Sequence, residues 1–146
     1  MRSKILFFAN IIATLYAICL LSVSFNSIIT TGGMGDARFW QQHSDMFYAL
    51  TSSKPSSMTV VYVFAALWMV HILLMTAGTV IGWIGYFKIN IRLMKTSTIL
   101  YLVGTICFPA CIIFALPITL FGFAGSRDQK QINVIIASEL QKSDSI

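Results

Sequence analysis

One residue able to do chemistry lies inside a long apolar stretch of this chain. His71 is flanked on both sides by an uncharged run from Met58 to Phe87. A polar group in such surroundings is expensive to keep without partners, and ionisable groups there are often functional. Imidazole binds metal ions and transfers protons near neutral pH. His71 is therefore a candidate metal ligand or proton-relay group.

Cysteines could complete such a site. Cys111 falls at a depth similar to that of His71, and Cys19 lies somewhat further out, so a metal or haem site is one hypothesis. The alternative is a neutral His71 imidazole that bonds to Tyr16 or to a backbone carbonyl and fixes helix register. We predict this structural role and no cofactor, because no Asp or Glu accompanies the histidine in the apolar runs. Cys residues in apolar runs usually behave as buried hydrophobes.

The remaining polar residues suggest no catalysis. Asn10, near the start of the first apolar run, is expected to bond across helices. His43 could bind a metal ion loosely with Asp36 and Asp45, but helical spacing turns Asp45 to another face, so a solvated face is predicted. The chain contains no Ser/His/Asp set or pair of buried carboxylates, and we predict that it is not an enzyme.

The elements that carry these residues are long apolar helices. Three stretches contain no Asp, Glu, Lys or Arg: Ile5–Gly35, Pro55–Phe87 and Thr96–Ser126. Each holds more than about 20 apolar residues, enough to cross the roughly 30 Å hydrocarbon core as a helix. Only 10% of the residues are charged. The sequence therefore predicts an all-α integral membrane bundle, residues 1–125, with spans at about 5–28, 58–87 and 99–124.

Two further segments are predicted to be amphipathic. Residues 36–50 follow a glycine-rich break, and their apolar side chains have helical spacing. This helix either lies in the outer membrane interface or packs as a lid on the bundle, and both alternatives stay open. Residues 126–146 are expected to form a surface helix that docks on the membrane or on a partner.

The third apolar run allows two topologies. It contains Pro109 and Pro117, and a single kinked crossing is the simplest interpretation by length. A hairpin that breaks at Pro109 would instead return the tail to the cytoplasm and improve the charge asymmetry, although each arm would have barely a dozen apolar residues. We predict a multi-pass plasma-membrane protein with a cytoplasmic N-terminus and residues 31–57 outside. The side of the C-terminus stays open.

Small residues recur at four-residue spacing in each apolar run. Such stripes let helix backbones approach closely in lipid. The predicted helix-packing residues are Ala9, Ala13, Ala17, Gly78, Gly82, Cys107, Cys111 and Ala115.

A resemblance to a family is carried by residues 77–126. It includes Ile81-Gly-Trp-Ile-Gly-Tyr-Phe-Lys88, Phe108-Pro109 and Leu116-Pro-Ile-Thr-Leu-Phe-Gly-Phe-Ala-Gly125. The segment resembles the C-terminal half of small, uncharacterised membrane proteins of low-GC Gram-positive bacteria. This resemblance implies a bacterial plasma membrane and a multi-helix bundle, and it implies no activity.

The function predicted from these features is binding without catalysis. We expect a small integral membrane protein that contacts membrane lipid and binds another membrane protein, a peptide or a second copy, in an accessory or immunity-type role. No nucleic-acid partner is expected, because the ten basic residues lie beside the apolar runs. The alternatives are a small transporter or channel subunit, and a metal- or haem-binding subunit that uses His71.

Overall fold

The chain folds into helices alone across residues 1–143, the part that this computed structural model describes. The helices are α1 (Lys4–Thr31), α2 (Ala37–Thr51), α3 (Met58–Lys88), α4 (Ile91–Cys107) and α5 (Ile112–Ser143), with a short 3₁₀ turn at Pro109–Cys111. The predicted all-α class is confirmed. Three helical segments are long and apolar enough to cross a membrane: Lys4–Thr31, Met58–Lys88 and Pro109–Lys142.

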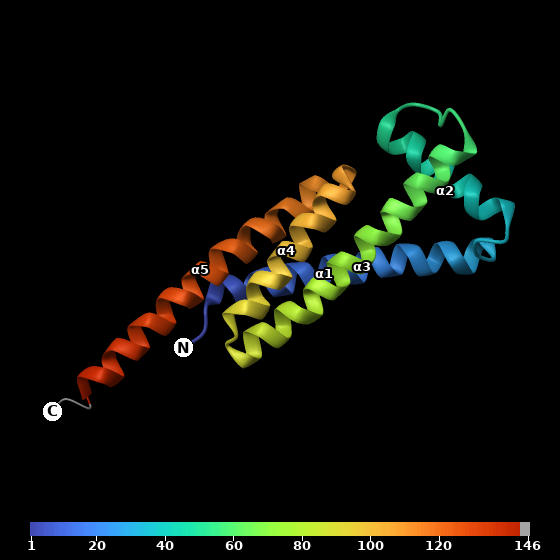
Figure 1. Cartoon of the computed structure of the whole chain (residues 1–146). Coiled ribbons are helices and arrows are strands. Elements are labelled where there is room, and N and C mark those ends of the chain that lie inside the picture. Colours follow the sequence, from blue (N-terminus) through green and yellow to red (C-terminus); the bar gives the residue numbers. More distant parts are fainter. Residues whose placement is uncertain (144–146) are drawn as a thin grey trace.

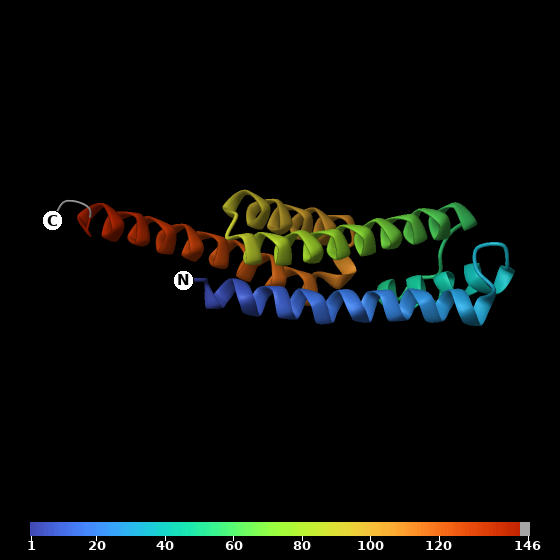
Figure 2. The ribbon, with the colours of Figure 1, turned by 90° about the horizontal axis from the view of Figure 1, so that it is seen from below.

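The helices run back and forth along one long direction. Figures 1 and 2 show α1 leading away from the N-terminus, α3 returning beside it, α4 running outward again and α5 returning. The chain enters α1 and leaves α5 at the same end of the molecule. We call this the basal end, and the opposite end, which carries α2, the distal end.

The third apolar run forms the hairpin and not the single kinked crossing that length favoured. Its residues are divided between α4 and α5, which pack against each other. The backbone leaves the helical region at Phe108, and Pro109 opens the 3₁₀ turn, where its missing N–H and fixed φ are tolerated. Pro117, in contrast, lies inside α5, which continues past it. The break therefore occurs at the first of the two prolines.

The hairpin reaches only part of the way to the distal end. Phe108 packs its ring against Phe64 and Trp68, with ring centroids 5.2 and 5.1 Å away. Since α3 begins at Met58, Trp68 lies about 15 Å inside the distal end of that helix. Figure 2 shows α1 and α3 continuing past the turn between α4 and α5.

Helix α2 occupies the distal region beyond this turn. Asp36 caps its N-terminus by accepting from the Arg38 backbone N–H at 2.8 Å, and Gly32 and Gly33 precede it with positive φ. Phe39 and His43 are buried, and Phe47 packs on Phe64 of α3 with ring centroids 5.4 Å apart. The apolar face of α2 is thus directed at α1 and α3, as in the lid alternative.

Candidate functional site

His71 joins three helices in the buried centre. Its side chain is fully buried, with Nδ1 2.8 Å from the Gly104 carbonyl oxygen of α4 and Nε2 2.8 Å from the Tyr16 hydroxyl of α1. A carbonyl oxygen only accepts, so we assign the ring hydrogen to Nδ1, and Nε2 accepts from Tyr16. Both ring nitrogens are occupied, and the arrangement fits the predicted hydrogen-bonded imidazole.

The cysteines do not assemble a ligand set around His71. Cys19 is exposed, and Cys107 and Cys111 are half-buried. Cys111 contacts the Tyr16 hydroxyl, and Cys19 lies near it. Within residues 1–143 no group of three or more His, Cys, Asp or Glu side chains is placed to hold a metal ion. With its two nitrogens already bonded, His71 would have to give up a helix contact to bind one.

The small-residue stripes lie inside the bundle. Ala9, Ala13 and Ala17 are at most 5% exposed, and Ala115 is fully buried. A methyl group added at Gly78 would come within 2.8 Å of the Tyr101 ring, and one at Gly82 would meet Asn10 and Ser97 just as closely. Only Cys107 and Cys111 are partly exposed. The stripes therefore pack the helices of this chain against one another.

Asn10 makes the kind of contact expected of it. Its amide Nδ2 donates to the Gly82 carbonyl oxygen of α3 at 3.2 Å, and the Ser97 hydroxyl of α4 donates to the Gly78 carbonyl oxygen at 2.7 Å. Side-chain bonds to carbonyl oxygens of neighbouring helices thus link α1, α3 and α4 along the glycine face of α3.

Two basal contacts had no signal in the sequence pattern. Gln129 is fully buried, and its Oε1 accepts from the backbone N–H of Ser3 at 2.8 Å. One turn inward, Gly125 lies so close to α1 that an added Cβ would stand 2.7 Å from the Leu6 backbone. Both pair residues more than 100 positions apart, and sequence periodicity does not report such pairings.

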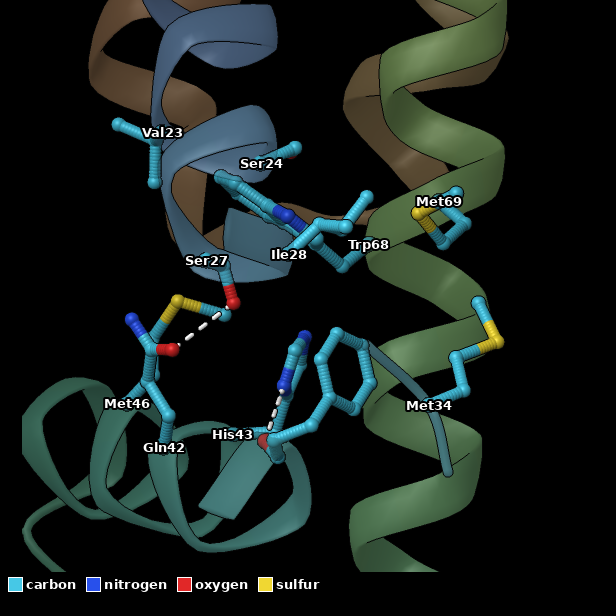
Figure 3. Close-up of a pocket in the computed structure, with 11 residues that line it drawn as sticks. Val23, Ser24, Ser27, Ile28, Met34, Gln42, His43, Met46, Trp68 and Met69 are labelled. Atoms are coloured by element: carbon cyan, nitrogen blue, oxygen red, sulfur yellow. Dashed lines mark hydrogen bonds between the residues drawn. The ribbon is translucent and has the colours of Figure 1, made fainter. Parts of the chain in front are cut away.

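A cavity lies at the distal end between α1, α2 and α3, and Figure 3 shows its lining. Its volume is about 40 Å³, and it is partly open. It is lined by Val23, Ser24, Ser27, Ile28, Met34, Phe39, Gln42, His43, Met46, Trp68 and Met69. Of the candidate metal ligands, His43 lines it, and His71, Asp36 and Asp45 do not.

The N-terminal cap of α2 is electrostatically fixed. The Arg38 guanidinium donates to Asp36 at 2.8 Å, and together with the capping N–H it lowers the pKa of that carboxyl from 3.8 to about 2. Asp36 faces Arg38 and lies outside the cavity lining, so its role is to begin the helix that covers the cavity.

The second half of α5 extends beyond the rest of the bundle. Figure 1 shows it continuing past the N-terminus as a single straight helix. One side of it carries Arg127, Lys130, Gln131, Val134 and Ile135, at the spacing of one helical face. We call these five residues the arm face. All five are exposed, and within residues 1–143 neither basic side chain makes an ion pair.

Comparison with protein-family models, curated proteins and solved structures finds no match.

Proposed function

We propose that the chain is an integral protein of the plasma membrane whose N-terminus and C-terminal helix are both cytoplasmic. Three apolar helical segments long enough to span a bilayer support membrane insertion. The hairpin gathers eight of the ten Lys and Arg residues at the basal end and leaves only Arg38 and Lys54 at the distal end. Positive residues favour the cytoplasmic side, so the asymmetry supports this orientation.

Its proposed role is to bind another membrane protein without catalysing a reaction. The observation that carries this proposal is the arm face, which extends beyond the bundle. It presents two cations that make no ion pair within residues 1–143, beside two exposed apolar side chains. A matching partner presents an apolar patch bordered by carboxylates, at the cytoplasmic surface of the membrane. Such charge complementarity gives specificity and orients the encounter.

The packing stripes are not the partner surface in this proposal. Ala9, Ala13 and Ala17 are already covered within the chain, as are Gly78 and Gly82. Burying them again against a partner would require opening the bundle. This places recognition at the end of α5 and leaves the interior with a structural role.

Site-specific photocrosslinking in native membranes tests the proposal. A photoreactive residue at Ile135 is expected to give one discrete adduct with another protein, whereas the same residue at Ile113, which is 76% exposed within the apolar part of α5, is expected to label lipid. Reversing the charges with Arg127→Glu and Lys130→Glu should remove the adduct, and Lys54→Glu should leave it unchanged. No protein adduct at Ile135, or an adduct only with a second copy, would contradict a separate partner protein.

A further inference from the structure

The distal cavity is built on a buried histidine with one unused nitrogen. His43 is only 6% exposed, and its Nδ1 lies 2.8 Å from the Phe39 carbonyl oxygen. Because that carbonyl can only accept, Nδ1 carries the hydrogen, and the neutral ring offers Nε2 as a hydrogen-bond acceptor. Among residues 1–143 nothing donates to this nitrogen. Figure 3 shows it directed away from the α2 backbone, toward Ser27 and Ile28.

A second polar group of the lining also lacks a partner. The Ser24 hydroxyl oxygen is buried and makes no hydrogen bond within the described chain. The neighbouring Ser27 hydroxyl, in contrast, donates to Gln42 Oε1 at 2.8 Å. Buried polar groups are nearly always paired, and each unpaired one calls for a reason. The Ser24 hydroxyl is such a group, and together with the unused Nε2 of His43 it indicates a site that a ligand or water completes.

The rest of the lining is apolar and adaptable. Met34, Met46 and Met69 come from the loop before α2, from α2 and from α3, and their unbranched thioether side chains adjust to ligands of different shape. Trp68, 8% exposed, supplies a rigid aromatic wall. An apolar cavity with a few convergent polar groups is the usual form of a small-molecule site.

The cavity also has an entrance. Val23, Ile28 and Met34 are about half exposed, whereas Phe39, His43 and Trp68 are nearly fully buried. The exposed residues form a rim and the buried ones a floor. Its volume of about 40 Å³ exceeds the 10–15 Å³ or so that one water molecule needs and is well below the roughly 150 Å³ of a cavity that binds benzene, so the site suits a molecule of only a few heavy atoms.

We propose that this cavity binds a small, mainly apolar molecule that carries a hydroxyl group. The ligand hydroxyl donates to His43 Nε2, and its hydrocarbon part lies among the methionines and against Trp68. A hydrocarbon without a donor leaves the nitrogen unpaired and binds more weakly. This site rests on the cavity alone and is independent of the arm face.

Quenching of tryptophan fluorescence by 2-bromoethanol tests the proposal on the full chain in detergent. Bromine quenches indole at short range, so a bound alcohol gives a saturable signal, and Trp68→Phe reduces that saturable part. Trp40, whose ring centroid lies 6.3 Å from that of His43, contributes the remainder. The dissociation constant should be about tenfold lower than for bromoethane, as expected for one added hydrogen bond to the unused nitrogen of His43. His43→Phe should abolish the preference for the alcohol, while Gln41→Ala, on the exposed side of α2, should retain it.

The outcomes separate binding from partitioning. Equal, non-saturating quenching by both bromides, or a preference unchanged in His43→Phe, overturns the proposal. If His43→Phe fails to fold, the imidazole ¹⁵N resonances of the unaltered protein test the same hydrogen bond. 2-Bromoethanol should shift the resonance of the unprotonated nitrogen of one histidine, and bromoethane should not. The absence of an alcohol-specific shift overturns the proposal.

Discussion

The Tyr16 hydroxyl lies 2.8 Å from Nε2 of His71, and this bond joins α1 to α3 at the level where α4 ends. The same imidazole holds the Gly104 carbonyl oxygen of α4 through Nδ1. One side chain thus sets the register of three helices. His71 thus has a structural role. In hydrocarbon surroundings an imidazole is costly unless both of its nitrogens are hydrogen-bonded, and here both are.

Removal of the Tyr16 hydroxyl should therefore weaken the bundle. In Tyr16→Phe, Nε2 of His71 loses its donor, and we expect the free energy of unfolding to fall by about 0.5–2 kcal/mol. Denaturant unfolding in mixed micelles, followed by circular dichroism, measures it. Tyr62→Phe is the matched control, because that ring is half exposed and its hydroxyl makes no hydrogen bond within the described residues. An equal decrease in unfolding free energy in both variants would contradict a stabilising bond between Tyr16 and His71.

Gly125 should tolerate no side chain. An added methyl group at this position would stand 2.7 Å from the backbone of Leu6, which cannot rotate away, so α5 must move from α1. We expect Gly125→Ala to destabilise the fold by about 1–3 kcal/mol. Gly35→Ala provides the control, since nothing lies within 4 Å of its added methyl group. A Gly125→Ala protein as stable as the control would show that α5 does not pack there.

Gln129 should contribute to the stability of the basal end, although it lies in a polar segment of the sequence. Gln129→Leu leaves the buried N–H of Ser3 without an acceptor, and such a loss costs about 1–3 kcal/mol. The basal end of α1 should then exchange its amide hydrogens faster, which mass spectrometry after deuterium labelling can follow. Gln131→Leu changes an exposed glutamine two positions away and should leave that exchange unaltered.

The cap of α2 predicts a specific titration. Asp36 has its pKa lowered to about 2 in the folded chain, chiefly by its bond with Arg38, so its contribution to stability is present above the ordinary value of 3.8 and is lost as the pH falls from about 4 to 2. The ¹³Cγ resonance of Asp36 should titrate near pH 2. In Arg38→Gln the midpoint should rise toward 3.8, and an unchanged midpoint would contradict the pairing.

The hairpin predicts where the two ends of the chain lie. Compartment-sensitive reporters placed before Met1 and after Ile146 should both report the cytoplasm, and a reporter inserted beside Lys54 should report the outside. A C-terminal reporter on the outside would restore the single kinked crossing and contradict the fold described for residues 91–143.

Part of this fold could be predicted from the sequence. Uncharged runs of this length form helices in lipid, and Asp36 after a glycine-rich break is a typical helix N-cap. These local features were sufficient to predict the all-α class. The hairpin was not the preferred prediction, because each helix of it was assumed to end where the apolar residues end, which left the two helices too short. In the structure α4 begins at Ile91, within the Lys88/Arg92/Lys95 cluster, and α5 continues past Arg127. Helices extend through charged residues wherever their backbone remains bonded.

The candidate sites were likewise predictable only where local sequence features determine them. A partner for His71 could be anticipated from Tyr16, because the two fall at similar depth in their runs. The cavity around His43 could not, since it depends on how α2 lies against α1 and α3, and only tertiary packing fixes that angle. The contact of Ser3 with Gln129 likewise arises from chain reversal at Phe108.

The partial depth of the α4–α5 hairpin has a consequence for how the chain is inserted. In the proposed orientation the hairpin begins and ends on the cytoplasmic side and its turn stays short of the distal end, so no hydrophilic loop of the C-terminal half has to be translocated. The only polar segment that crosses is residues 32–57, in which Asp36 and Asp45 balance Arg38 and Lys54. Biogenesis then requires the passage of one short stretch with no net charge, and the membrane potential neither opposes nor drives it.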